Sequence, residues 1–228
     1  LRSLAAGVAL LMAVGALAGC GGEKKADDSK KMVTVGIAQL VEHGALDAAN
    51  KGFVAGMASK GFKENENVKY DRQNAQADQS NLQNIAQRFV SNKVDLICAI
   101  ATPTAQTMAN ATKDIPIVAT AVTDYEVAKL AASNNEPKGN VTGTSDMNPI
   151  DQQLELLLKI APQTKNIGTV YSSSEVNSQL QVDVLKKLAG DKGINVIEAT
   201  VSTVNDIQQA AHSLVGLALI HISEPTRH

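Results

Sequence analysis

The chain has 228 residues, which is enough for one large domain or two modest ones. Charged residues make up 19% and the formal net charge is −2, so no basic field is present to hold nucleic acid or an anionic membrane surface. Aromatic residues make up only 3% and tryptophan is absent, so an exposed platform for stacking bases is not expected. Two cysteines, Cys20 and Cys98, are too few for a disulfide framework.

Residues 1–19 are predicted to be a lipoprotein signal peptide. Arg2 precedes an apolar run, Leu4–Ala18, which is shorter than the roughly 20 residues that a membrane-spanning helix needs. The tetrapeptide Leu17-Ala18-Gly19-Cys20 resembles the lipobox of bacterial lipoprotein signals. Cys20 is therefore expected to carry lipid and to become the first mature residue. A plain signal peptide or an uncleaved anchor is the alternative.

Residues 20–31 hold this cysteine and a polar, strongly charged stretch. Such a stretch cannot bury enough apolar surface to fold, so it is predicted to be a flexible tether.

Residues 32–123 alternate between strand and helix patterns and are predicted to form a first lobe. Val94–Ile100 is almost continuously apolar, which is typical of a strand buried on both faces. This alternation predicts a parallel sheet covered by helices. The expected strands are 33–38, 68–72, 94–100 and 115–122, and the expected helices are 44–60, 79–91 and 102–113.

Residues 149–215 repeat the alternation and predict a second, incomplete lobe. Between the lobes, residues 124–148 are predicted to be a hinge region that includes a strand at 141–145, because 133–140 is rich in turn-forming residues. The expected helices are 149–160, 175–192 and 203–214, and the expected strands are 166–171 and 194–201. The pattern allows one more strand at 216–221. We interpret the chain as truncated in this lobe and residues 216–228 as a tail of doubtful, non-native origin.

Polar residues follow the predicted strands, at the edge of an α/β sheet where ligands bind. Thr102 is able to cap the helix after the third strand, and Pro103 suits its first position. Free amides and the helix dipole at such an end favour an anion such as a carboxylate. A capped helix without a ligand explains the pattern equally well. Ser172–Ser174 repeats this arrangement in the second lobe, with the same alternative.

Three single residues allow two interpretations each. Asp124 follows the fourth strand and either pairs with an ammonium group or forms a turn. His43 either donates to a ligand or sits on a solvated loop. Cys98 lies within an apolar strand and is expected to be a buried, inert thiol rather than a nucleophile.

The motifs of common enzymes and of metal sites are absent from the sequence. It contains no phosphate loop, no dinucleotide fingerprint, no zinc-protease motif, no nucleophile elbow and no cysteine and histidine set with zinc spacing. We therefore expect no enzyme activity, no catalytic residues, no metal and no cofactor.

Six ordered motifs carry a family resemblance. The chain resembles the substrate-binding proteins of ABC transporters, in the group that includes tryptophan- and tyrosine-type solute-binding lipoproteins. The resemblance covers Lys31 to about Val215. The motifs are Gln39–His43, Asp95–Ala105, Ile115–Val118, Ala121–Asp124, Gly139–Asp146 and Glu175–Ser178.

The resemblance implies a two-lobed α/β fold like that of periplasmic binding proteins, which closes on a ligand between its lobes. An amino acid, of an aromatic kind, is the implied ligand, with its carboxylate near Thr104 and its ammonium at a carboxylate such as Asp124. Tyr125, which stands where the family often has proline, or Tyr171 would form an aromatic wall. The residues implied to line the site are Gln39, Thr102, Thr104, Ala105, Thr123, Asp124, Ser145, Asp146, Glu175, Asn177 and Ser178.

The implied partners follow from the same resemblance. They are a small-molecule ligand, an ABC permease with its ATPase, and the membrane through the lipid anchor, with the protein itself an extracytoplasmic monomer. Two other function classes remain as alternatives: a ligand-sensing receptor lipoprotein of the same fold, and an exported hydrolase.

Overall fold

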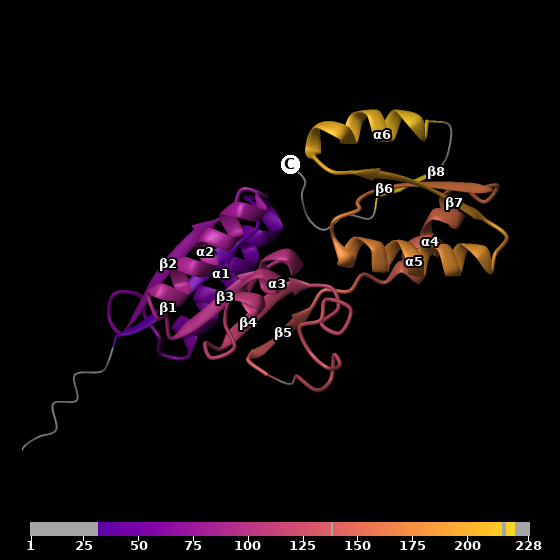
Figure 1. Ribbon diagram of the computed structural model, residues 1–228. Helices are drawn as coiled ribbons and strands as arrows, with labels where there is room; N and C mark the ends of the chain where they lie inside the picture. The colour runs from indigo at the N-terminus through magenta and orange to yellow at the C-terminus, as the bar shows by residue number, and fades with distance from the viewer. Residues whose placement is uncertain (1–31, 138, 216–217, 222–228) are drawn as a thin grey trace, which may run out of the picture. The chain divides into compact units, whose positions relative to one another are not determined.

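The structure is a computed structural model that describes residues 32–137, 139–215 and 218–221 (Figure 1). The predicted signal peptide, the lipidation site at Cys20 and the tether lie outside the described residues. Within the described part, no helix is both long and apolar enough to cross a membrane.

The first lobe is built on a five-stranded parallel sheet in the order β2-β1-β3-β4-β5. Because β2 lies on one side of β1 and the later strands on the other, right-handed crossovers place α1 on one face and both α2 and α3 on the opposite face. Helices α2 and α3 pack against each other, as this rule requires. The strands are β1 (Val33–Gln39), β2 (Val68–Asn74), β3 (Leu96–Ile100), β4 (Ile117–Val122) and β5 (Val141–Ser145), and the helices are α1 (Gly44–Ser59), α2 (Gln79–Ser91) and α3 (Thr102–Ala111).

The core of this lobe is centred on β3, whose residues Ile97 to Ile100 are buried. Phe89 of α2 lies so close to β1 that a Cβ on Gly36 would meet its ring at 2.8 Å, which explains the glycine in that strand. Burial raises the pKa of the Cys98 thiol to about 12. Cys98 is therefore the inert, buried cysteine that its apolar strand indicated.

The last strand, β5, belongs to the first sheet, so the packed core extends beyond residue 123. The pairing of β4 with β5 shifts register between Ala119 and Val122. The Tyr125 hydroxyl spans this irregularity and donates to the carbonyls of Ala119, at 2.9 Å, and Thr144, at 3.2 Å. A Cβ on Gly143 would lie 1.9 Å from the Ala119 oxygen, so only glycine fits there. Whether residues 124–148 act as a hinge stays a prediction.

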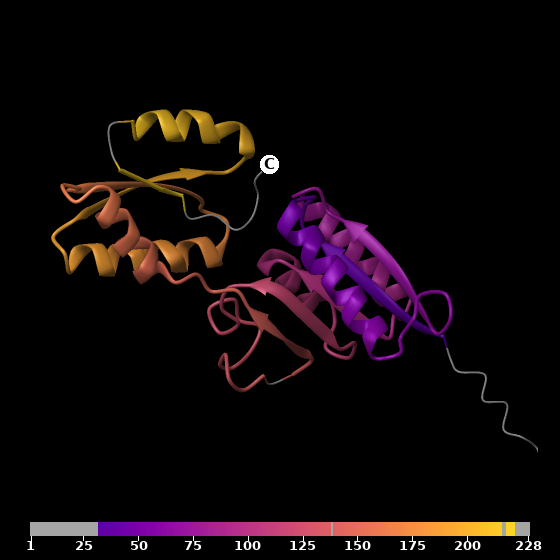
Figure 2. The ribbon, with the colours of Figure 1, turned by 180° about the vertical axis from the view of Figure 1, so that it is seen from behind.

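The second lobe holds a three-stranded parallel sheet in the order β7-β6-β8. Helices α4 and α5 lie on one face and α6 on the other (Figure 1 and Figure 2). The elements are α4 (Ile150–Ile160), β6 (Asn166–Ser172), α5 (Val176–Gly190), β7 (Asn195–Val201), the 3₁₀ helix η1 (Val204–Asp206), α6 (Ile207–Ser213) and β8 (Ala218–His221).

The core of this lobe lies between α4, α5 and the sheet. Leu154 of α4, Ile167 of β6 and Leu185 of α5 are all fully buried there. The additional strand that the pattern allowed at 216–221 is present as β8. Residues 222–228 lie outside the described part, and the interpretation of 216–228 as a non-native tail stays a prediction.

Candidate functional site

The start of α3 stands at the carboxyl edge of the first sheet. Ala101 occupies the cap position with a positive φ of 86°, and its N–H donates to the Thr120 carbonyl of β4 at 3.0 Å. Thr102 is already the first helical residue, and no side chain caps the helix. The prediction that Thr102 is the cap is therefore wrong, because the chain leaves β3 through a left-handed residue that the sequence does not reveal.

Two threonine hydroxyls at this helix start are buried without a partner. Thr102 is 1% exposed and Thr104 is 0% exposed, and neither Oγ1 atom has a hydrogen-bond partner among the described residues. An unpaired buried hydroxyl costs about 1–3 kcal/mol. The N–H groups of the first helical turn also have no acceptor within the helix, and the helix dipole is positive here. Hydroxyl and amide donors together make a site suited to an anion.

The other two predicted residues near this edge have structural roles. Ala105 is fully buried in the core of the first lobe. Gln39 is 4% exposed and connects β1 to α1: its Nε2 donates to Val41 O at 2.9 Å and Asp47 Oδ1 at 2.6 Å, and its Oε1 accepts from Asn50 at 3.1 Å. Both amide hydrogens of Gln39 are thereby used.

The ends of β4 and β5 bring Thr123, Ser145 and Asp146 together. Ser145 Oγ donates to the Thr123 carbonyl at 2.7 Å, and the Asp146 N–H donates to the Val122 carbonyl at 3.1 Å. Loss of water around the Asp146 carboxyl raises its pKa, and a hydrogen bond from the Thr123 side chain partly offsets that rise. Asp146 thus follows β5 at the carboxyl edge of the same sheet from which α3 starts.

Asp124 adopts the turn role that was its alternative interpretation. Its Oδ1 accepts from the Val127 N–H and its Oδ2 accepts from Asn134 Nδ2, both at 2.8 Å. His43 acts in a similar local way, because its Nδ1 accepts from the Ala45 N–H at 3.2 Å and caps α1. Each of these side chains fixes its own loop.

In the second lobe, the predicted residues gather where β6 leads into α5. Glu175 is the cap residue of α5, and its Oε2 accepts from Asn177 Nδ2 at 3.3 Å and from Ser178 Oγ at 3.4 Å. Burial raises the pKa of Glu175, and these two hydrogen bonds lower it in part. The serines before it do not cap the helix: Ser172 and Ser174 join their hydroxyls at 2.9 Å.

The match to known proteins agrees with this arrangement of polar residues at strand ends. A family model for ABC transporter substrate binding proteins matches residues 34–220. The chain belongs to this family. The resemblance found in the six motifs is thereby confirmed, together with the two-lobed α/β fold.

Three relatives of this substrate-binding family illustrate the match. The tyrosine-binding protein of Clostridioides difficile (strain R20291) is 48% identical over 217 residues, which are 92% of this chain and 63% of that protein. The crystal structure of an ABC domain in complex with L-Trp from Streptococcus pneumoniae is 38% identical, with a TM-score of 0.80, and the match covers 84% of this chain and 65% of that one.

A ligand-free, open substrate-binding protein with adhesive properties from Clostridium difficile is 49% identical, with a TM-score of 0.62. That match covers 83% of this chain and 65% of the other. The chain therefore spans just under two thirds of the length of the relatives that it matches.

Neither tyrosine considered as an aromatic wall of the substrate-binding site is exposed. Tyr125 is 7% exposed and fixed to β4 and β5, and burial raises its pKa to about 12. Tyr171 is 4% exposed, and its hydroxyl lies 2.6 Å from Glu198 Oε2 and 3.0 Å from Gln179 Oε1. Both rings belong to the cores of their lobes.

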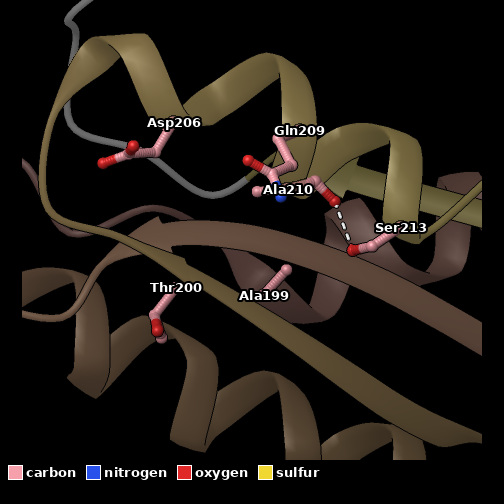
Figure 3. A pocket seen from close by; sticks show the side chains of 6 residues that line it. All are labelled: Ala199, Thr200, Asp206, Gln209, Ala210 and Ser213. Atoms are coloured by element: carbon pink, nitrogen blue, oxygen red, sulfur yellow. Dashed lines mark hydrogen bonds between the residues drawn. The ribbon is translucent and has the colours of Figure 1, made fainter.

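A hollow of about 310 Å³ lies between α6 and β7, away from the predicted site residues (Figure 3). Its one ionisable lining residue is Asp206, whose carboxylate already accepts from the N–H and hydroxyl of Thr203. Ser213 Oγ donates to Ala210 O on the other side. Across the described residues no group of histidine, cysteine and carboxylate side chains is arranged to hold a metal ion. Asp206 and Ser213 thus both bond to neighbours on their own helical turns.

The sequence patterns did not predict a polar contact between Gln181 of α5 and Asn148, which precedes α4. Gln181 of α5 is fully buried, and its Oε1 accepts from Asn148 Nδ2 at 2.7 Å. A glutamine one turn beyond Asn177, on the same helix face, was the available signal.

Proposed function

We propose that the protein is the solute-binding component of an ABC uptake transporter and that it captures an amino acid. The observation that carries the proposal is the pair of buried, unpaired hydroxyls, Thr102 and Thr104, at the amino end of α3. A carboxylate placed there would accept from these hydroxyls and from the free amides of the first turn. Family membership supports capture and release, without bond chemistry, as the mechanism.

The ligand's ammonium group needs a carboxylate near the same sheet edge. Asp146 suits this role better than Asp124, because both oxygens of Asp124 are already held in a turn. An ammonium ion beside Asp146 would also relieve the loss of hydration that raises its pKa. The tyrosine-binding relative and the relative in complex with L-Trp support an aromatic amino acid as the ligand.

Glu175, Asn177 and Ser178 would supply contacts from the second lobe when the lobes close around the ligand by a hinge motion at 124–148. Three other predicted residues would hold the strand ends and the helix start in place without contacting the ligand. These are Gln39, Ala105 and Thr123.

We further propose that the protein works outside the cytoplasm as a monomer, anchored by lipid on Cys20 after removal of residues 1–19, and passes its ligand to a permease. Metabolic labelling with a radioactive fatty acid tests the anchor. Label that is lost with Cys20→Ser is the expected result, and label retained in that variant contradicts it.

The binding proposal is tested by thermal unfolding of the protein from residue 21 onward, with and without each of the twenty amino acids. A ligand that binds only the folded state raises the melting temperature. We expect L-tyrosine or L-tryptophan to raise it, and Thr104→Val to remove that rise. The same variant should stabilise the ligand-free protein by about 1 kcal/mol, because it deletes an unpaired buried hydroxyl and keeps the shape.

Thr169→Val is the matched control. Thr169 in β6 is also fully buried, and its hydroxyl also lacks a partner within the described ranges, but it lies in the core of the second lobe. It should raise the stability in the same way and leave the ligand response intact. If Thr104→Val still binds as the unaltered protein does, the carboxylate site is misplaced; if no amino acid stabilises the unaltered protein, the amino-acid proposal fails.

A further inference from the structure

Two buried side-chain amides on α5 of the second lobe each have one polar atom without a hydrogen-bond partner among the described residues. Asn177 is 2% exposed and its Oδ1 has no hydrogen-bond partner among the described residues; Gln181 is 0% exposed and its Nε2 likewise has none. The two residues are four positions apart, so they are neighbours on one face of the helix. Unpaired polar atoms at such depth are uncommon in folded proteins and indicate a role beyond packing.

The opposite end of each amide is held by a neighbour. Gln181 Oε1 accepts from Asn148 Nδ2 at 2.7 Å, and Asn177 Nδ2 donates to Glu175 Oε2 at 3.3 Å. What remains unpaired is therefore a donor on Gln181 and an acceptor on Asn177. These two groups are complementary, and they are borne by residues one helical turn apart.

The direction of both amides is fixed by the groups at the two ends. An ionised carboxylate such as Glu175 only accepts hydrogen bonds, so Asn177 must turn its nitrogen toward it. At the other end, Asn148 presents its nitrogen, so Gln181 must turn its oxygen toward Asn148. Asn148 stands directly before α4, where its carbonyl accepts from the Ile150 N–H at 2.9 Å.

We propose that Asn148, Gln181 and Asn177 form a directional relay of side-chain amides that ends on Glu175, with Gln181 as the positioning residue. Two of its three links, from Asn148 to Gln181 and from Asn177 to Glu175, are hydrogen bonds in the structure. The third link, from Gln181 Nε2 to Asn177 Oδ1, is open in the structure, and a small rotation about the broad terminal torsions of the two side chains would close it. Gln181 thereby fixes which atom of Asn177 faces Glu175.

The relay has a consequence for ligand capture that rests on the proposed function. Asn177 and Glu175 belong to the predicted ligand face of α5, whereas Asn148 belongs to the segment that leads out of the first lobe. A change of backbone at Asn148 would therefore alter the orientation of groups that meet the ligand. Gln181 itself would act only through Asn177 and would not touch the ligand.

The relay is tested first in the ligand-free protein, by following the side-chain amide resonances of Asn177 by NMR. Gln181→Met has nearly the same volume and removes both polar groups, and Asn148→Ala removes the other end of the relay at an exposed position. Both should shift the Asn177 resonances and speed their hydrogen exchange. Gln179→Met is the control, because Gln179 bonds to Tyr171 and Asp183 instead. Unchanged Asn177 resonances in both relay variants would overturn the proposal.

Affinity for L-tyrosine and L-tryptophan, measured by calorimetry, is the second test. Loss of one hydrogen bond worth about 1 kcal/mol predicts roughly fivefold weaker binding for Gln181→Met. In an Asn177→Ala background the same substitution should cause no further loss, because its effect passes through Asn177. An equal loss in both backgrounds contradicts the positioning role. If the unaltered protein binds neither amino acid, the aromatic ligand of the proposed function is wrong, and the NMR result alone decides the relay.

Discussion

The two lobes share one construction principle but differ in how completely they bury their apolar residues. The first sheet has helices on both faces, and Ile97 to Ile100 of its central strand are buried. In the second lobe, Ile197 of β7, on the face that α6 covers, is 40% exposed and Val204 of η1 is 70% exposed. Between α4, α5 and the sheet, Leu154, Ile167 and Leu185 are fully buried. The difference teaches that the proposed carboxylate site at α3 and the proposed contact residues of α5 both lie on helices that pack against the well-buried faces of their sheets.

The largest effect is expected in the first lobe, at Gly143. A Cβ there would lie 1.9 Å from the Ala119 oxygen and 2.1 Å from the Tyr125 hydroxyl, and neither the strand backbone nor the buried tyrosine is able to move freely. Gly143→Ala should cost more than about 4 kcal/mol of unfolding free energy, measured with urea. Gly52→Ala, in α1 with open space around it, should instead be neutral or stabilising by up to about 1 kcal/mol. Equal stabilities for the two variants would contradict the described β4–β5 contact.

The second lobe should respond most strongly at the closed face. Leu154 of α4 is fully buried, and Leu154→Ala is expected to cost about 2–5 kcal/mol. Leu156, two residues later on the same helix, is 58% exposed, and Leu156→Ala should change the stability by about 0.5 kcal/mol or less. Urea unfolding followed by circular dichroism compares them. A large effect at Leu156 would show that the outer face of α4 is covered in the folded protein.

The smallest expected effect is a difference between the lobes in how one carboxylate of each makes stability depend on pH. Burial alone would raise the pKa of Asp71, but hydrogen bonds from Arg88 and Gln73 hold it below its usual value. Its stabilising contribution is therefore complete above the unfolded pKa, near 4, and is lost as the pH falls through the lower folded pKa. Because Arg88 is half exposed, this contribution should stay below about 1 kcal/mol.

Glu175 should act in the opposite direction, because burial raises its pKa. Its ionised form costs stability above the folded pKa, and that cost disappears as the pH falls toward the unfolded value near 4. Asp71→Asn should therefore lose less stability on acidification than the unaltered protein, whereas Glu175→Gln should lose more. Thermal unfolding between about pH 3 and 7 distinguishes the two. Identical pH profiles for both variants would contradict the assigned shifts.

The order of strands and helices was predictable because a buried parallel strand and an amphipathic helix leave different apolar periods in the sequence. The contact between Thr123 and Ser145 was likewise predictable, since neighbouring parallel strands end at one edge. The cap at α3 was not, because the positive φ of Ala101 is set by the sheet and not by its residue type. For Asp124 the sequence left a turn and a ligand contact open, and the structure shows the turn. The burial of Tyr125 was not predictable, because its hydroxyl bonds to carbonyls that only the pairing of β4 with β5 brings together.

The buried thiol of Cys98 allows opening of the first lobe to be followed at its central strand. In the protein from residue 21 onward it is the single cysteine. A thiol reagent in solution reacts with it only when the sheet opens, since the protonated, enclosed sulfur is unreactive. The rate of labelling therefore measures how often the sheet opens at Cys98, and no introduced probe is needed. A ligand that binds at the end of this same strand would slow that reaction in proportion to its occupancy.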